Sequence, residues 1–147
     1  MEISLKSIEK SNWEECIQLK VREDQEDNMA SNLYSIAEVQ FLNGFICKAI
    51  YLDEAMIGFV MYGMDPDDNN YWIYRFMIDE RYQNNGYGKK ALQLVVEEIN
   101  IQENKTDKLL LGYSNSNETA RRLYRSVGFV ETGIAPWGEM IAQYKFM

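Results

Sequence analysis

The spacing of apolar residues changes several times along the chain and predicts alternating strands and helices. Apolar and polar residues alternate over residues 3–8, which predicts a first strand. Residues 11–14 have the form of a capping box, and apolar side chains follow at helical spacing over residues 13–21, which predicts a first helix. A second capping box, which opens at Ser35, predicts a short helix that ends near Gly44.

The middle of the chain is rich in apolar runs that are typical of strands. Residues 45–52 and 55–62 are two such runs with a short acidic link, so they predict a β-hairpin. Within it, Gly58 marks a bulge or a point of close backbone approach. An acidic turn at residues 65–70 follows. Residues 71–78 are almost continuously apolar or aromatic, which predicts a central strand that is covered on both faces.

The last part of the chain repeats the order strand, helix, strand. One apolar face over residues 88–99 predicts a long helix. Residues 109–113 predict a buried strand, and the next helix opens in polar residues and ends at Gly128. Residues 129–134 and 139–146 predict a final antiparallel pair. We therefore expect an α/β domain with a mixed sheet of about seven strands and four helices.

Length and composition agree with one domain over residues 1–147. Apolar residues make up 46% of the chain, and no repeat or linker interrupts it. No apolar run approaches the roughly 20 residues that cross a bilayer, and the first residues lack the features of a secretory signal. We expect a soluble, cytoplasmic protein without a membrane partner.

The residue types limit the chemistry. The chain has no histidine, which excludes nucleophiles activated by histidine and most catalytic zinc sites, so no metal is expected. Cys16 and Cys47 lack a second cysteine at metal-ligand spacing and predict buried free thiols. A net charge of −8 argues against nucleic acid as a partner. It is compatible with an amine substrate, and equally with a charge that only keeps the protein soluble.

A glycine-rich turn stands between the central strand and the long helix. Glycines allow close backbone approach, and the free N–H groups of a helix N-terminus suit a pyrophosphate, although such a turn can also simply reverse the chain. A P-loop is excluded because Gln83 and Lys90 stand where it needs glycine and a hydroxyl residue. A dinucleotide fingerprint over residues 86–91 can be written, but too few residues follow for a doubly wound half.

Together with residues further along, this turn resembles a known motif. The sequence Q-x-x-G-x-G from Gln83, the sequence N-x-x-A-x-x-L-Y from Asn117 and the pair Gly128-Phe129 resemble the acetyl-CoA-binding region of GNAT acetyltransferases. Residues 75–82, with Tyr62-Gly63 upstream, are similar to the bacterial spermine/spermidine acetyltransferase branch. The resemblance implies the GNAT fold, acetyl-CoA as cofactor, a polyamine as acceptor and the possibility of a homodimer.

The resemblance also implies a cofactor site. The pyrophosphate would bind the backbone amides of the turn, and the central strand would offer its backbone to the pantetheine arm, after separating from its neighbour beyond Met77. Asn117 would bind the cofactor or cap the fourth helix, and one side chain could do both. The implied cofactor residues are Met77, Ile78, Gln83, Asn84, Asn85, Gly86, Tyr87, Gly88, Lys89, Asn117 and Tyr124.

Tyr124 matches the position of the family's general acid. It lies seven residues after Asn117, two helical turns, so both side chains can address one groove. A phenol with a reference pKa of about 10 can protonate the departing thiolate, although Tyr124 could also be a core aromatic. Members of the family often have a carboxylate on the central strand that acts as the general base, but in this chain Tyr74 aligns with that position. A water chain or a carboxylate after the first helix would then take the amine proton.

The acceptor side is less defined. Carboxylates after the first helix could pair with ammonium groups of the acceptor, or they could simply be a solvated run of charge. Aromatic residues could add cation–π contacts, or they could simply be core residues. The candidates are Glu23, Asp24, Glu26, Tyr34, Trp72 and Tyr74. The sequence therefore predicts direct acetyl transfer to a polyamine. The alternatives are acetylation of protein N-termini, lysines or other small amines, and a CoA-binding sensor without turnover.

Overall fold

The structure is a computed structural model that describes residues 1–23, 25 and 30–146. Its strands are β1 (Ile3–Ser7), β2 (Phe45–Leu52), β3 (Ala55–Met64), β4 (Tyr71–Ile78), β5 (Lys108–Tyr113), β6 (Val130–Ile134) and β7 (Met140–Lys145). Its helices are α1 (Trp13–Gln18), α2 (Asn32–Val39), α3 (Tyr87–Asn100) and α4 (Glu118–Val127), with a short 3₁₀ helix η2 (Glu80–Tyr82). None of these helices is both long and apolar enough to cross a membrane.

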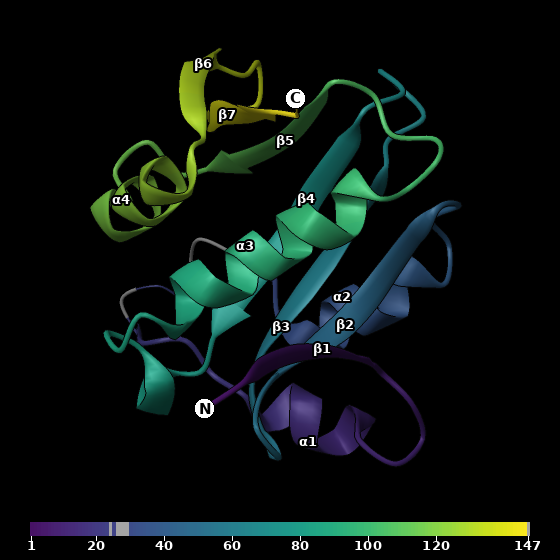
Figure 1. The fold of residues 1–147 in the computed structure, drawn as a ribbon, viewed down its shortest axis with the longest axis vertical. Coiled ribbons are helices and arrows are strands. Elements are labelled where there is room, and N and C mark those ends of the chain that lie inside the picture. The colour runs from purple at the N-terminus through teal and green to yellow at the C-terminus, as the bar shows by residue number, and fades with distance from the viewer. Residues whose placement is uncertain (24, 26–29, 147) are drawn as a thin grey trace.

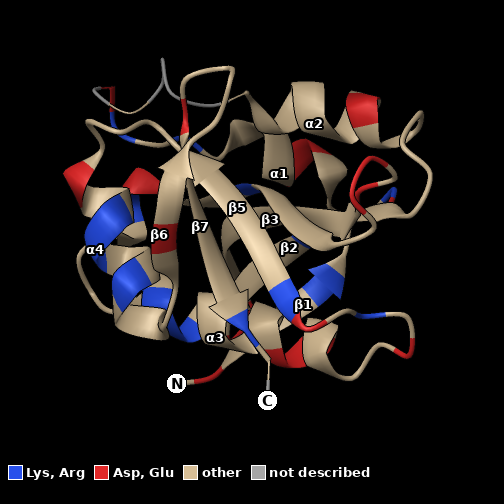
Figure 2. Ribbon diagram, turned by 90° about the horizontal axis from the view of Figure 1, so that it is seen from above, with Lys and Arg blue, Asp and Glu red and all other residues tan. Residues whose placement is uncertain are grey.

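One mixed sheet separates two layers of helices. The strand order is β1-β2-β3-β4-β5-β7-β6, so β4 is central, and the pair β4–β5 is parallel while its neighbours are antiparallel. Figure 1 shows α3 lying across the sheet, and the view in Figure 2 places α1 and α2 on one side of the strands and α3 on the other. This arrangement confirms the expected α/β fold and the central place of residues 71–78.

Each face of the sheet has its own core. On the α3 and α4 side, the apolar face of α3 packs on strand residues such as Ile73, Phe76 and Ile78. On the α1 and α2 side, Cys16 and Leu19 pack on Phe59 and Met77. Because successive residues of a strand point to opposite faces, β4 contributes side chains to both cores. This explains why its sequence is apolar almost without interruption.

The two cysteines are free thiols, as expected from their spacing. Cys16 is fully buried and Cys47 is partly buried. Burial raises the pKa of each thiol to about 12, so both stay protonated at neutral pH. Their role is packing between α1, α2 and the sheet.

The predicted capping boxes of the first two helices are wrong, although α1 does begin at Trp13 as expected. Asn12, not Ser11, precedes α1, and its side chain accepts a hydrogen bond from the backbone of Glu9 instead of capping the helix. The N-cap of α2 is Ser31, whose hydroxyl accepts from Tyr34 N, and Ser35 lies buried inside the helix. For α2 the reason is a tertiary contact. Buried Asn32 donates to Cys16 O at 2.9 Å, and this contact fixes the first turn of α2 against the end of α1.

The strands β4 and β5 separate earlier than the sequence suggests. We expected separation beyond Met77, but β4 pairs with β5 only from Tyr71 to Ile73, against Leu109 to Leu111. On the other edge of β4, Met61 pairs with Arg75 and Tyr62 with Ile73, so Tyr74 is an extra, bulged residue. A bulge bends its strand and increases the local twist, which accounts for the early divergence.

The hairpin β2–β3 lies tightly against β4. A Cβ atom on Gly58 would lie 2.4 Å from the carbonyl oxygen of Met77, closer than real Cβ atoms approach backbone. The β2–β3 register also shifts beside it, after Ile50 pairs with Gly58. Gly58 is therefore a close-approach point, one of the two alternatives expected for it, and it also lies beside a bulge.

Asp79 joins the end of β4 to the segment after α1. Its carboxylate is buried and accepts hydrogen bonds from the backbone N–H groups of Lys20 and Arg81 and from Arg81 Nε, at 2.8–3.0 Å. Burial acts to raise the pKa of Asp79, but these hydrogen bonds and the Arg81 charge outweigh it and hold the pKa below its usual range. The ionised carboxylate thus fastens the chain just before the glycine-rich turn.

Replacing Gly58 tests the close contact with β4. We expect Gly58→Ala to lower the free energy of unfolding by about 1–3 kcal/mol, the usual cost of overpacking, because backbone must move. Urea denaturation measures the change. The matched control is Gly88→Ala in the first turn of α3, where a Cβ would meet only side chains at 3.6 Å or more. An equal loss of unfolding free energy in Gly58→Ala and Gly88→Ala would contradict a tight contact between the hairpin and β4.

Replacing Asp79 tests the buried carboxylate. We expect Asp79→Asn to lower the free energy of unfolding at pH 7 by about 1.5–3 kcal/mol, the range for hydrogen bonds to charged groups. Because the folded pKa lies below the unfolded value, the stabilisation is complete above pH ~4 and is lost as pH falls through the folded pKa. The gap between the two proteins in urea denaturation should therefore close in acid. A gap that persists unchanged at pH 2 would contradict this account.

Candidate active site

One large cleft opens where β4 and β5 separate. Its volume is about 750 Å³, and its walls come from both faces of the sheet. Phe76, Ile78 and Leu123 line it on the α3 and α4 side, whereas Glu38 and Tyr74 line it on the α2 side. The cleft therefore passes between the two strands and connects two differently lined ends.

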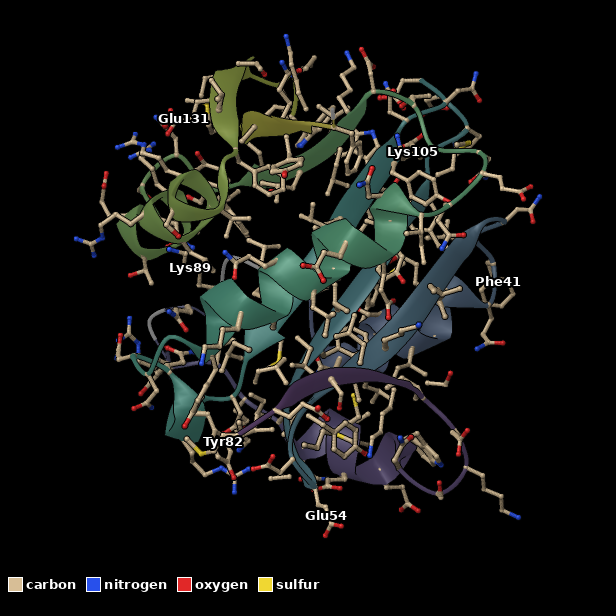
Figure 3. The ribbon with its side chains drawn as sticks, in the orientation of Figure 1. Phe41, Glu54, Tyr82, Lys89, Lys105 and Glu131 are labelled. Carbon is tan, nitrogen blue, oxygen red and sulfur yellow. The ribbon has the colours of Figure 1, made fainter. Side chains whose placement is uncertain are left out.

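The first end is formed by the glycine-rich turn and the start of α3. Asn84 and Gly86 have left-handed backbone, with φ of 66° and 81°, so the turn presents successive N–H groups on one side. Gly86 occupies the N-cap position of α3, so the N-cap residue has no side chain that could bond to the first N–H groups of the helix. Lys89 lies on the first turn of α3, on the side of the helix toward α4 (Figure 3). Uncapped N–H groups, the helix dipole and a lysine make an anion site.

Gln83 holds this turn against the rest of the chain. Its Nε2 donates to Ile78 O at 2.8 Å and to the side chain of Gln25 at 3.0 Å. Asn85 donates to the carbonyl groups of Tyr82 and Gln83 and thus stabilises the turn from its exposed side. These two amide side chains fix the turn, and the backbone faces the cleft.

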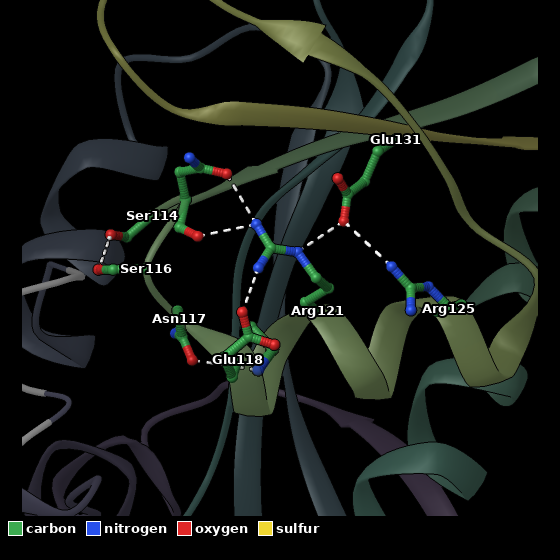
Figure 4. Close-up of polar contacts among 9 residues, drawn as sticks. Ser114, Ser116, Asn117, Glu118, Arg121, Arg125 and Glu131 are labelled. Carbon is green, nitrogen blue, oxygen red and sulfur yellow. Dashed lines mark hydrogen bonds and ion pairs between the residues drawn. The ribbon is translucent and has the colours of Figure 1, made fainter.

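The start of α4 forms the opposite wall of the same end. Asn117 caps α4, with its Oδ1 accepting from Ala120 N at 3.1 Å, and it also lines the cleft. Figure 4 shows that Arg121 secures the preceding loop. Its guanidinium donates to Asn115 O and Oδ1, both at 2.7 Å, to Glu131 at 2.7 Å, and to Glu118. Arg121 thereby links the loop to α4 and β6.

Tyr124 lies deep in the cleft. It is 9% exposed, and its ring packs against Tyr113 and Phe129 at centroid distances of 5.5 and 5.9 Å. Burial, with smaller contributions from Tyr113 and Glu139, raises the pKa of Tyr124 above its ordinary value. The phenol is therefore protonated at neutral pH and is available as a proton donor to anything bound beside it.

The second end of the cleft is rich in carboxylates and aromatic rings. The Tyr74 hydroxyl donates to Asp65 Oδ2 at 2.5 Å, and burial together with this bond raises the pKa of Tyr74. Glu38 pairs with Arg75 at 2.9 Å. Among the described residues, the carboxylates that line the cleft are Glu38, Asp65, Asp67 and Glu139, and the indoles are those of Trp72 and Trp137.

The structure brings most of the proposed site residues to this cleft, but not all. The lining includes Met77, Ile78, Gln83, Asn84, Gly86, Gly88, Lys89, Asn117, Tyr124, Trp72 and Tyr74. Asn85 and Tyr87 belong to the turn and helix start without lining the cleft, and Glu23 is exposed. Tyr34 is 58% exposed and borders a separate shallow hollow on α2. Asp24 and Glu26 lie outside the described residues.

Sequence reasoning missed several residues of the second end. Asp65 and Asp67 belong to a turn that is recognisably acidic, but only the topology shows that it borders the cleft. Glu38 lies on α2 and Glu139 in the β6–β7 connection, and neither position carries a local signal of function. Among the described residues, the carboxylates of this end therefore come from segments that the sequence did not single out, and most of the acidic run after the first helix lies outside the described residues.

Comparison with known proteins assigns the chain to a family. Residues 5–129 match the model of the acetyltransferase (GNAT) family. The chain is 30% identical over 139 residues to the spermine/spermidine N(1)-acetyltransferase of Bacillus subtilis (strain 168), covering 90% of this chain and 91% of that protein.

Solved structures agree in fold. The aminoglycoside acetyltransferase AAC(6')-Ib in complex with coenzyme A is similar with a TM-score of 0.82 at 15% identity, covering 98% of this chain and 95% of that one. The ribosomal-protein-S18-alanine N-acetyltransferase of Escherichia coli is similar with a TM-score of 0.70 at 18% identity, over 98% and 94% of the two chains. The match over residues 5–129 makes this chain a member of the GNAT acetyltransferase family.

Proposed function

We propose that this enzyme transfers an acetyl group from acetyl-CoA to a primary amine of a polyamine such as spermine or spermidine. The observation that carries the proposal is the cleft between β4 and β5, which joins an anion site to a carboxylate-lined end. A cosubstrate with a pyrophosphate suits the first end, and a cationic acceptor suits the second. The separation of the strands lets the two meet.

The residues of the first end fit coenzyme A. The backbone N–H groups from Gln83 to Gly88 would bind the pyrophosphate, with Lys89 adding positive charge. Between Tyr74 and Ile78, the edge of β4 that faces β5 has no strand partner in the described structure. Its backbone groups are therefore available to the pantetheine arm and to the oxyanion that forms at the acetyl carbonyl.

Tyr124 would act as the general acid of a direct transfer. The neutral amine attacks the acetyl carbon, the C–N bond forms, and the C–S bond breaks as Tyr124 gives its proton to the departing thiolate. A group that is buried and protonated at neutral pH fits this role. A direct transfer needs no covalent enzyme intermediate, because the cleft joins the end proposed for the cosubstrate to the end proposed for the acceptor.

Charge and similarity support a polyamine as the acceptor. A polyamine carries several ammonium groups, and Asp65, Asp67 and Glu139 line the cleft as carboxylates that can each pair with one of them. The indoles of Trp72 and Trp137 add faces that attract cations. The similarity to the B. subtilis spermine/spermidine enzyme over 90% of the chain favours the same class of acceptor.

An amine panel tests the acceptor. We expect kcat/KM for spermidine and spermine to exceed that for an alkyl monoamine of similar length by tenfold or more at low salt, because several charges are recognised. Added salt should narrow the difference by screening these charges. Release of free CoA thiol measures the rates, with an aminoglycoside and an alanine N-terminal peptide as further acceptors.

The panel has outcomes that would overturn the acceptor. Equal rates for polyamines and alkyl monoamines would contradict recognition of several charges on the acceptor. A clear preference for the aminoglycoside or the peptide would indicate a different substrate. None of these outcomes would affect the family assignment, because acetyl transfer itself would still be observed.

Replacing Tyr124 tests the acid. We expect Tyr124→Phe to lower kcat by about 10²- to 10⁴-fold, the usual contribution of a positioned proton donor, while acetyl-CoA affinity changes little. The ring contacts with Tyr113 and Phe129 should persist. Steady-state kinetics and calorimetry of acetyl-CoA binding measure the two effects separately.

The matched control is Tyr144→Phe. Tyr144 belongs to the same aromatic cluster, with its ring centroid 5.6 Å from that of Phe129, but it does not line the cleft. It should keep nearly full activity. If Tyr124→Phe is equally active, Tyr124 is a packing residue, and if affinity and rate fall together, its hydroxyl binds the cofactor.

A further inference from the structure

Glu139 lies where β4 and β5 begin to diverge. Leu111 is the last residue of β5 that pairs with β4, and Gly112 follows it. A Cβ atom on Gly112 would lie 3.0 Å from Glu139 Oε1, so the missing side chain makes room for this carboxylate. Leu111 and Tyr113 belong to the core on the α3 and α4 side, so the Glu139 carboxylate lies on the opposite face of β5.

The carboxylate is held in place by a neutral group. Trp137 Nε1 donates a hydrogen bond to Glu139 Oε1 at 2.7 Å. Among the described residues, no other hydrogen bond to the Glu139 side chain is present. The side chain is partly exposed and lines the cleft. The other carboxylate oxygen is therefore available to a ligand, and no cation among the described residues forms an ion pair with Glu139.

The other carboxylates of the cleft are placed differently. Asp65 accepts a hydrogen bond from Tyr74, and Glu38 forms an ion pair with Arg75. Asp67 is exposed in the β3–β4 turn, before the segment in which the two strands still pair. Glu139 alone among these four adjoins the residue of β5 at which the separation begins.

The position of Glu139 also relates it to the acid. Tyr124 packs on the α3 and α4 side, whereas Glu139 lies on the other face, so a substrate between the strands would have one group on each side. The two are close enough for the Glu139 charge to contribute to the raised pKa of Tyr124. An acetyl group delivered from the first end would therefore meet an amine delivered past Glu139.

We propose that Glu139 is the general base, which binds the reacting ammonium group and takes its proton; this inference rests on the proposed acetyl transfer to an amine. An ammonium group of reference pKa near 10.4 is neutral in only about one molecule in a thousand at pH 7, so a base is needed. The carboxylate adjoining Gly112 supplies it at the reacting centre.

The protons of this reaction balance. Glu139 takes one proton from the ammonium group, and the neutral amine attacks the acetyl carbon. Tyr124 protonates the thiolate as the C–S bond breaks, and the second proton leaves the nitrogen to restore the phenol. Glu139 then releases its proton to solvent. The sum converts an ammonium ion and acetyl-CoA into an acetylamide, CoA and one proton.

The pH dependence of Glu139→Gln tests the proposal with whichever amine the wild-type enzyme acetylates best. At pH 7 we expect kcat/KM to fall about 10²- to 10⁴-fold, with acetyl-CoA affinity in calorimetry unchanged. The wild-type profile should be nearly flat from pH 6.5 to 9. The variant should rise about tenfold per pH unit, because it depends on amine that is already neutral, so the deficit should shrink toward pH 10.

Two further variants separate a base from a merely structural or electrostatic residue. Asp67→Asn removes the same charge from the same cleft and should raise KM while keeping the wild-type shape of the pH profile. Gly112→Ala keeps the carboxylate but displaces it, and should show a milder form of the Glu139→Gln profile.

The titratable groups that share the cleft bear on the profile. Among the described residues they are, besides Glu139, Glu38, Asp65, Asp67, Tyr74, Arg75, Lys89, Tyr113 and Tyr124. Parallel profiles for wild type and Glu139→Gln would overturn the proposal and leave the proton to water or to one of these groups. If spermidine is a poor substrate but another amine shows the expected pair of profiles, the polyamine acceptor fails and Glu139 remains the base.

Discussion

The separation of β4 from β5 is the constraint on which the rest of this structure depends. Parallel neighbours would normally pair along their length, and their paired backbone groups would close the sheet. The bulged residue Tyr74 ends that pairing after Ile73 while β4 stays paired with β3. One extra residue in the central strand thus converts a continuous sheet into one with an opening, and it leaves polar backbone groups available to a ligand.

The opening can position substrates only if the strands and loops on its two sides are rigid. Buried contacts supply this rigidity. On the β4 side, the close approach of Gly58 to the Met77 carbonyl group locks the strand to the hairpin behind it. Asp79 fastens the segment that follows β4. On the β5 side, the Arg121 network holds the loop that leads into α4. The cleft is therefore a gap between two well-supported walls.

Local sequence rules predicted some of the site, and topology decided the rest. The glycine-rich turn and the Asn117 cap depend on backbone and side chains a few residues apart, so their placement was readable from the sequence. The caps of α1 and α2 were not, because the Asn12 side chain binds the backbone of Ser7 and Glu9, and because the contact of Asn32 with Cys16 places the start of α2. The carboxylates at the second end lie on a helix, a turn and a strand connection. Their proximity follows only from the order of strands in the sheet.

A protein with a net charge of −8 must still attract the anionic phosphates of CoA, and the distribution of charge resolves this conflict. Figure 2 shows basic residues gathered on α4, whose sequence contains Arg121, Arg122 and Arg125, and Lys89 and Lys90 lie on the first turns of α3. The Debye length at physiological salt is about 8 Å, so a bound phosphate responds to this local basic group more than to distant carboxylates. The acidic residues of the β3–β4 turn lie at the other end of the cleft, and the Glu139 carboxylate lies where the two strands diverge. Opposite local fields at the two ends favour an anion at one and a cation at the other, which orients two substrates of opposite charge toward a common centre.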